Sequence, residues 1–108
     1  MPLPDVLRRL LTAAGPSGYE GAPAAVFAQA ARDFTQDVST DVMGSVTARV
    51  PGTIPGTPSL AVVGHIDEIG LIVTHVDDQG FLRVTGIGGW DAQILVGQRV
   101  PPTDPGDP

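Results

Sequence analysis

The stretch that decides the fold reads Ser-Leu-Ala-Val-Val-Gly at residues 59–64 and continues as His-Ile-Asp-Glu-Ile-Gly-Leu at residues 65–71. The first part is apolar without alternation, which is typical of a strand buried on both faces of a sheet. The second part opens with polar groups where that strand would end. Ligands of α/β sheets collect at the carboxyl ends of strands. The sequence therefore predicts a covered sheet with a polar site at its edge.

Two helices are expected before this strand. Residues 5–14 carry apolar side chains at helical spacing, and Gly15-Pro16 stops the pattern. Residues 22–34 are rich in alanine, and Pro23 is expected in the first turn of this second helix. Helices followed by strands indicate an α/β or α+β arrangement of layers. The stripe that the second helix should bury consists of Val26, Phe27, Ala30, Ala31 and Phe34.

Short β-branched segments predict two hairpins around the buried strand. The first joins residues 36–43 to residues 45–50, and the second joins residues 69–76 to residues 81–85 through a loop with a glycine. A further short strand is expected at residues 94–100. Because no helix signal follows the second helix, we expect the second half of the chain to be β-rich and different in kind from the first.

Composition narrows the class of protein. The 108 residues include 6 basic residues, all arginine, and 12 acidic residues, giving a formal net charge of −6. This acidic excess disfavours nucleic acids and anionic membranes as partners. Cysteine is absent, which excludes disulfides and thiolate chemistry, and no apolar run approaches the roughly 20 residues that cross a bilayer. We expect a cytoplasmic protein with neither a nucleic-acid nor a membrane partner.

Candidate chemistry concentrates on His65 and the two acids that follow it. A neutral imidazole is a good ligand for zinc and similar divalent metals. Asp67 lies two residues on, hence on the same side of an extended chain, where a carboxylate can orient a metal-bound imidazole. The spacing alone is equally typical of a histidine and two acids exposed at a strand end. A catalytic zinc would also need about three protein ligands.

Other polar and aromatic residues are expected to have structural roles. His75 should be a rim or core-edge histidine on the second hairpin, and Asp41 should stabilise a turn. Asp91 should cap or tighten a loop beside Trp90, which should anchor packing. Residues 17–20 have the spacing of a capping box, but Pro23 would then lie inside the helix, so we expect the regular helix to begin nearer residues 20–22. Ser17 has no nearby base that would make it a nucleophile.

Several strings in this chain together resemble one protein family. They are Pro16-Ser17-Gly18-Tyr19-Glu20, Asp41-Val42-Met43-Gly44-Ser45, His65-Ile66-Asp67-Glu68-Ile69-Gly70-Leu71, Gly88-Gly89-Trp90-Asp91 and Leu95-Val96-Gly97-Gln98-Arg99-Val100. In this order they resemble the M42 family of metallo-aminopeptidases, which includes the glutamyl aminopeptidase type and the tetrahedral TET peptidases. The resemblance extends from about residue 5 to residue 100.

The resemblance implies an aminopeptidase that uses two divalent metal ions, zinc or cobalt, to remove N-terminal residues from peptides. Such a pair of ions polarises the scissile carbonyl and activates a bridging water. His65 resembles the first metal ligand, and Asp67 resembles the catalytic-site carboxylate that orients it. Glu68 matches the motif without an assigned role. The family's remaining ligands and its general base would follow residue 108, so this chain should hold at most one partial metal site.

The resemblance also implies a division into parts. Residues 1–68 resemble the start of a zinc-peptidase-like α/β sandwich, the catalytic domain, and residues 69–100 the start of an inserted, β-barrel-like dimerisation domain. Residues 101–108 are expected to be a disordered, proline-rich tail. Since both domains would be incomplete, we expect an N-terminal fragment that is inactive alone, from a family that forms homo-oligomers from dimers to dodecamers.

Two alternatives remain open at this point. The chain could be a non-catalytic binding or assembly piece whose β region at residues 69–100 pairs with another chain through exposed strand edges. It could also be a fragment without independent function, because half a core seldom offsets the entropy of the chain.

Overall fold

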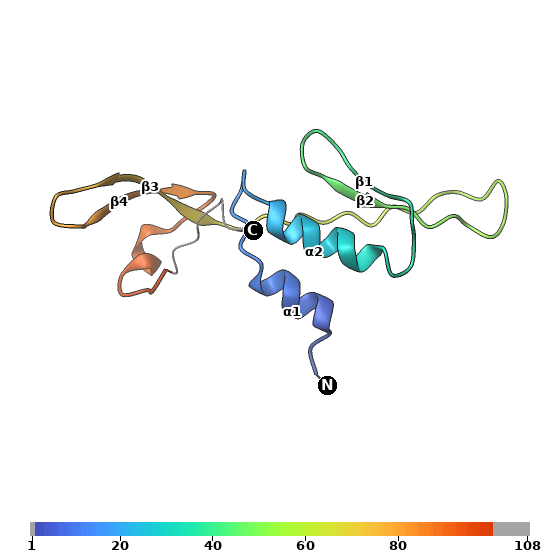
Figure 1. Cartoon of the computed structure of the whole chain (residues 1–108), viewed down its shortest axis with the longest axis horizontal. Coiled ribbons are helices and arrows are strands. Elements are labelled where there is room, and N and C mark those ends of the chain that lie inside the picture. The colour runs from blue at the N-terminus through green and yellow to red at the C-terminus, as the bar shows by residue number, and fades with distance from the viewer. Residues whose placement is uncertain (1, 101–108) are drawn as a thin grey trace.

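A computed structural model describes residues 2–100, and Figure 1 follows the chain through them. The described residues form a mixed structure of short helices and two separate two-stranded antiparallel sheets, without a barrel or a sandwich among them. The tail at residues 101–108 lies outside the described residues. The elements are α1 (Asp5–Thr12), α2 (Gly21–Ala31), β1 (Val38–Thr40), β2 (Val46–Ala48), β3 (Gly70–Val76), β4 (Leu82–Ile87) and the 3-10 helix η1 (Ala92–Leu95).

The two helices form where the apolar spacing predicts them. α1 ends at Thr12, shortly before Gly15, and Pro23 stands in the first turn of α2. A Cβ atom on Gly15 would lie 2.4 Å from Cγ of Pro23, so glycine permits the close approach of this loop to α2. Arg9 adds a hydrogen bond of 2.6 Å from its guanidinium to the side-chain oxygen of Gln29. None of the helices in residues 2–100 is both long and apolar enough to cross a bilayer.

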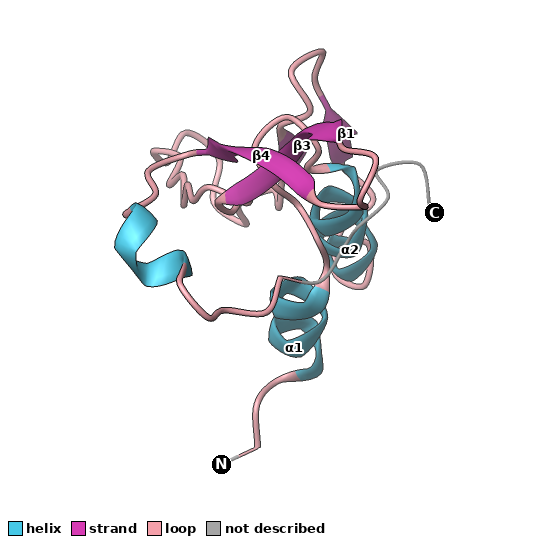
Figure 2. Cartoon of the chain, turned by 90° about the vertical axis from the view of Figure 1, so that its left-hand side faces the viewer, coloured by secondary structure: helices cyan, strands magenta, loops and turns pink. Residues whose placement is uncertain are grey.

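The buried side of α2 differs from the predicted stripe. Ala31 is 1% exposed and Ala28 is 8% exposed, whereas Phe34 is 64% exposed and lies beyond the end of the helix. Phe27 also remains partly exposed. The β1–β2 hairpin packs against α2 (Figure 2), and the small residues Ala24 and Ala28 of α2 line the space between them. The prediction was therefore correct for Ala31 and wrong for both phenylalanines.

The first predicted hairpin is confirmed. β1 pairs antiparallel with β2, with Val38 opposite Ala48 and Thr40 opposite Val46. The carboxylate of Asp41 accepts hydrogen bonds of 2.9 Å from the backbone N–H groups of Met43 and Ser45. Asp41 is thus the turn residue that the sequence predicts, and its side chain serves the backbone of the loop.

The predicted buried strand at residues 59–64 is wrong. The chain there carries no strand pairing, and Leu60, Val62 and Val63 are 90%, 92% and 90% exposed. Figure 1 shows this segment as a long trace between the β1–β2 hairpin and β3. A strand buried on both faces needs hydrogen-bonded neighbours and covering helices. Residues 2–100 place no strand beside this segment, so its apolar side chains stay in contact with solvent.

The second predicted hairpin is also confirmed. β3 pairs antiparallel with β4, with Gly70 opposite Ile87 and Val76 opposite Leu82. A bulge between Val73 and His75 interrupts the two-residue alternation on which the placement of His75 depended. His75 is exposed on this hairpin, so it lies at a rim and not at the edge of a core.

A 3-10 helix replaces the strand predicted at residues 94–100. η1 begins after Asp91, whose carboxylate accepts a 3.0 Å hydrogen bond from the N–H of Gln93. Trp90 donates a 2.7 Å hydrogen bond from its indole nitrogen to the carbonyl of Gly70, across the β3–β4 hairpin. The capping role of Asp91 and the anchoring role of Trp90 are therefore confirmed. Residues 96–100 adopt no regular structure because no neighbouring strand pairs with them.

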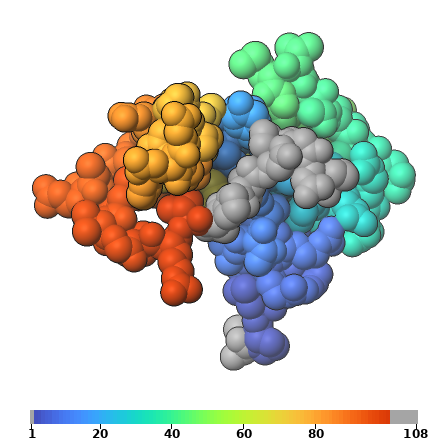
Figure 3. Space-filling model, turned by 60° about the vertical axis from the view of Figure 1, so that its left-hand side comes forward, coloured from blue at the N-terminus to red at the C-terminus, as the bar shows by residue number. Residues whose placement is uncertain are grey.

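The molecule is elongated, with extents of 65 × 37 × 26 Å and a radius of gyration of 18.1 Å. A compact domain of this length would have a radius of gyration of about 13 Å. Figure 3 shows the β3–β4 hairpin and η1 as one mass, set apart from the helices and the first hairpin. The accessible surface is 9188 Å², against about 5,700 Å² expected for a folded chain of this mass. Much apolar surface is therefore still exposed to water.

Candidate metal-ligand site at His65

The site lies where two segments far apart in sequence meet. The loop between α1 and α2 contacts the chain just before β3 through a parallel bridge between Pro16 and Glu68. The N–H of Glu68 donates to the carbonyl of Gly15 at 2.9 Å, and the N–H of Ser17 donates to the carbonyl of Glu68 at 3.2 Å. These backbone contacts fix the polar segment that follows the exposed run.

The side chain of Glu68 strengthens the same junction. Its carboxylate accepts a 3.1 Å hydrogen bond from the N–H of Gly15. A Cβ atom on Gly70 would lie 2.7 Å from Cβ of Pro16, so the start of β3 also lies close against this loop. The sequence assigned no role to Glu68. In the structure, Glu68 joins the loop between α1 and α2 to the segment that contains His65.

His65 and Asp67 form a hydrogen-bonded pair. Nδ1 of His65 lies 2.9 Å from Oδ1 of Asp67 and 3.0 Å from the backbone oxygen of the same residue. Both oxygens can only accept while the carboxylate is ionised, so the neutral imidazole must carry its proton on Nδ1. The side chain of His65 is 86% exposed. Nε2 consequently keeps its lone pair and has no hydrogen-bond partner among residues 2–100.

The carboxylate of Asp67 is shared between two neighbours. Its second oxygen, Oδ2, accepts a hydrogen bond from the hydroxyl of Ser17, which lies 50 positions earlier in the chain. The hydrogen bond from Ser17, and next the one from His65, hold the pKa of the Asp67 carboxyl below its ordinary value of 3.8. Asp67 is therefore an anion at neutral pH, which suits it to orient an imidazole.

The hydrogen bonds of the Asp67 carboxylate should weaken only when the pH falls below the ordinary pKa of an aspartate carboxyl. A carboxyl whose pKa is lower in the folded than in the unfolded chain stabilises the fold above the unfolded pKa, and that contribution is lost as the pH falls through the folded pKa. We therefore expect the Ser17–Asp67 hydrogen bond to persist at pH 3.8 and to weaken in more acidic solution. A carboxyl carbon NMR titration of the metal-free chain measures this, and a midpoint for Asp67 at or above 3.8 would contradict it.

The residues of this site could supply one ligand of a metal ion. His65 offers one unengaged nitrogen, and an imidazole backed by a carboxylate is the usual form of a metal-bound histidine. Asp67 already uses both oxygens, one toward Ser17 and one toward His65. Within residues 2–100, no three histidine or acidic side chains gather closely enough to hold a metal ion. The described residues thus offer one ligand with its supporting carboxylate, and a complete site would need further donors.

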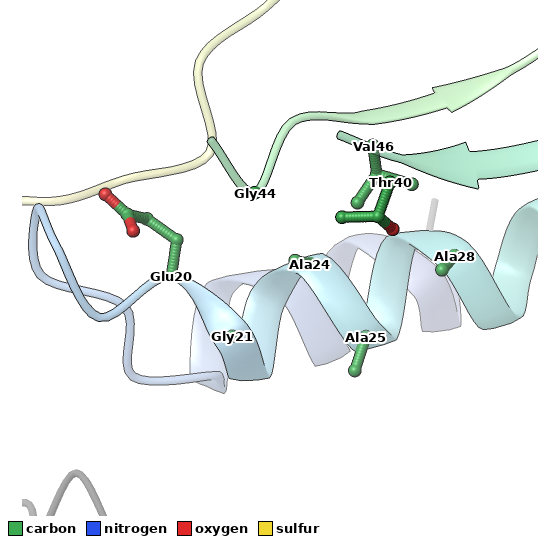
Figure 4. A pocket seen from close by; sticks show the side chains of 8 residues that line it. All are labelled: Glu20, Gly21, Ala24, Ala25, Ala28, Thr40, Gly44 and Val46. Carbon is green, nitrogen blue, oxygen red and sulfur yellow. The ribbon is translucent and has the colours of Figure 1, made fainter. Parts of the chain in front are cut away.

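Two hollows lie near these elements. The first, of about 250 Å³, has the segment 65–68 on one side and apolar residues of the helical region on the other, namely Leu10, Leu11, Ala13 and Pro23. The second, of about 320 Å³, lies between α2 and the β1–β2 hairpin and is lined by small residues with Glu20 at one end (Figure 4). The Glu20 carboxylate accepts a 2.6 Å hydrogen bond from the N–H of Gly18, so it serves the loop. Only the first hollow adjoins His65.

The structure adds one residue whose role the sequence did not reveal, Ser17. The position of Pro23 predicted that the second helix begins near residues 20–22 and not at Ser17, and α2 indeed begins at Gly21, with Glu20 at its N-cap position and no side-chain cap. The hydroxyl of Ser17 faces Asp67 instead. No local spacing could reveal this contact. The one available signal was the joint occurrence of the strings containing Ser17 and His65 in the family resemblance.

A family model decides the assignment. The model for the M42 glutamyl aminopeptidase family matches residues 44–103, more than half of the chain. The chain belongs to the M42 family. The M42 match includes both His65 and Asp67, together with the β3–β4 hairpin, whereas Ser17 lies outside it.

Several named aminopeptidases are similar to part of the chain. The chain is 58% identical over 43 residues to the Escherichia coli protein named "Putative aminopeptidase FrvX". It is 44% identical over 43 residues to the lysyl aminopeptidase of Pyrococcus furiosus and 38% identical over 42 residues to the glutamyl aminopeptidase of Lactococcus lactis. These matches cover 40%, 40% and 39% of the chain, respectively, and span 12% of the length of each relative.

Proposed function

We propose that this chain carries part of the active site of a metal-dependent aminopeptidase, a hydrolase that removes N-terminal residues from peptides. One observation carries the proposal: His65, inside the M42 match, is held by Asp67 through Nδ1 and presents an unengaged Nε2 to solvent. Divalent metals bind such a nitrogen well. When bound, the metal would polarise the scissile carbonyl and lower the pKa of a water.

In this proposal the residues of the chain have separate tasks. His65 binds one of two divalent ions, zinc or cobalt, and Asp67 keeps the imidazole in the tautomer and orientation that binding needs. No three histidine or acidic side chains gather within residues 2–100, so further donors would have to complete the site. The hollow beside His65 has an apolar wall from α1 and Pro23, which would limit access of water to the imidazole from that side.

The proposal extends to the larger organisation of the protein. Residues 1–68 would belong to the α/β sandwich of a catalytic domain, and residues 69–100 to a β-barrel-like dimerisation domain. The change from helices and a short hairpin to the separate β3–β4 hairpin supports this division. Peptides would be the substrates, copies of the protein would form homo-oligomers, and a cytoplasmic location suits a chain without cysteine.

The relatives give a reason not to assign a side-chain preference to this segment. One matched relative is named a lysyl and another a glutamyl aminopeptidase, which indicates opposite charges on the residue removed. Both match a segment of similar length in this chain, with 44% and 38% identity. We therefore propose that substrate selectivity depends on residues outside the matched segments.

Metal binding by the chain itself tests the ligand role of His65. Titration with Co²⁺ or Zn²⁺, followed by ring-nitrogen NMR, should perturb Nε2 of His65 at a lower metal concentration than either ring nitrogen of His75. The reason is that Asp67 fixes the tautomer of His65 and places a negative charge behind the ring, which favours a cation at Nε2. The substitution His65→Ala should remove the stronger site.

His75→Ala is the matched control, because His75 is the only other histidine and is also exposed. This variant should keep the stronger site. Equal metal affinity in the two variants, or a stronger site lost with His75, would contradict the assignment.

A second candidate function rests on a different observation. The apolar run at residues 59–64 is almost fully exposed, and residues 50–64 contain no charged side chain. An exposed, uncharged apolar run without proline, such as residues 59–64, is a template for strand pairing. The chain could therefore act as a non-catalytic assembly piece that pairs through this segment. The Discussion gives the experiment that tests it.

A further inference from the structure

We propose that Ser17 is a positioning residue for the metal-ligand histidine, acting through Asp67. Its hydroxyl donates a hydrogen bond to one oxygen of the Asp67 carboxylate. The other oxygen then remains hydrogen-bonded to Nδ1 of His65, and Nε2 is on the side of the ring away from Asp67. The inference rests on the proposed function in one respect, because the positioning would serve metal binding. The positioning itself is a property of the metal-free chain.

The carboxylate geometry is the first support. Asp67 uses Oδ2 for the hydroxyl of Ser17 and Oδ1 for the imidazole of His65, so each oxygen has its own partner. An aspartate in an extended chain can otherwise rotate about two side-chain bonds. Two hydrogen bonds at opposite oxygens remove that freedom, and the one from Ser17 does so from a separate part of the chain.

The backbone around Ser17 is the second support, because it is held without the hydroxyl. The N–H of Ser17 donates to the carbonyl of Glu68, and Glu68 contacts Gly15 through its own N–H and through its carboxylate. The N–H of Tyr19 closes a turn onto the carbonyl of Pro16 at 2.8 Å. The loop therefore places the Ser17 side chain, and removing the hydroxyl alone should leave the loop in position.

Other roles for this hydroxyl do not fit its surroundings. Ser17 is not the cap of α2, which has Glu20 at its N-cap position. A nucleophilic serine needs a base that takes its proton, commonly an imidazole. Within the described residues, the hydroxyl of Ser17 donates its hydrogen bond to Asp67. The same carboxylate is also hydrogen-bonded to the ring of His65. The hydroxyl therefore acts as a donor that orients a carboxylate.

The test compares variants of the whole 108-residue chain at a pH where the imidazole is neutral. Ring-nitrogen NMR reports how the proton is divided between Nδ1 and Nε2 of His65. We expect Ser17→Ala to increase the Nε2-protonated fraction, because a mobile carboxylate holds the Nδ1 proton less well. The backbone oxygen of Asp67, 3.0 Å from Nδ1, should preserve part of the original preference.

Metal affinity gives a second readout. Loss of a group that supports a metal-bound histidine typically weakens metal binding by about 10- to 100-fold, and we expect Ser17→Ala to fall at the lower end of that range. Ser17→Thr keeps a hydroxyl and should restore both the tautomer ratio and the affinity. Because Ser17 acts through Asp67, adding Ser17→Ala to Asp67→Ala should produce no further change.

The outcomes separate the inference from the proposed function. An unchanged tautomer ratio in Ser17→Ala would overturn the positioning role. A change that Ser17→Thr does not reverse, or one accompanied by displaced backbone amide signals at Gly15 and Glu68, would also overturn it in favour of a structural role for the residue. If the tautomer ratio changes as expected but His65 binds no metal in any variant, the positioning role stands and the metal-ligand role of His65 fails.

Discussion

His65→Ala is expected to lower peptide hydrolysis at least about 1,000-fold in an active enzyme that contains this segment. A metal ion stabilises the charge of the transition state by several kcal/mol, and a tenfold rate change corresponds to about 1.4 kcal/mol. The measurement uses a chimera in which the chain is continued by the part of the Escherichia coli relative that follows its matched segment. The two sequences are 58% identical where they match, which favours compatible packing.

Two controls accompany this chimera. His75→Ala should retain the activity of the parent chimera, because His75 is an exposed residue of the β3–β4 hairpin, away from Asp67. The 108-residue chain without the added part should hydrolyse no aminoacyl substrate with zinc or cobalt, since its described residues supply one ligand and no complete site. Robust metal-dependent turnover by that chain alone would show that the catalytic residues have been assigned wrongly.

Val62→Lys is expected to weaken self-association of the chain at least about 100-fold. Val62 is 92% exposed and lies in the apolar run at residues 59–64, near the end of the uncharged segment at residues 50–64. Full burial of a valine contributes about 1.5–3 kcal/mol. In a symmetric dimer that pairs the segment 59–64 of two copies, each copy would contribute one such valine. Sedimentation equilibrium over a range of protein concentrations measures the dissociation constant.

Thr53→Lys is the matched control for this substitution. Thr53 lies in the same uncharged stretch and is also exposed, but it precedes the apolar run. It adds the same charge to the chain and should leave the dissociation constant within a few-fold of its original value. A parent chain that remains monomeric at every concentration, or equal effects of the two lysines, would rule out the assembly role of residues 59–64.

Local patterns in the sequence were enough for elements held together by near neighbours. α1 and α2 follow from apolar spacing, and each hairpin follows from two β-branched segments joined by a turn. The roles of Asp41 and Asp91 follow as well, because each carboxylate bonds to backbone N–H groups two to four residues away. Such contacts need nothing from distant parts of the chain.

Predictions that needed distant neighbours failed. The run at residues 59–64 has the composition of a buried strand, yet composition cannot supply the strands that must lie beside it. The same reason applies to residues 94–100, where η1 ends at Leu95 and residues 96–100 adopt no regular structure. The predicted burial of Phe27 and Phe34 failed for the same reason, since it would require a covering layer that the described residues do not form.

The candidate site combines both kinds of information. The sequence by itself was enough to predict that His65 and Asp67 form a pair, because they stand two positions apart in an extended segment and can meet without help. Only the tertiary structure decided that Ser17 completes the pair, since its hydroxyl reaches Asp67 across 50 positions. The physical reason is that this contact depends on the backbone pairing of Gly15 and Ser17 with Glu68, and a pairing between segments so far apart leaves no periodic trace in either one.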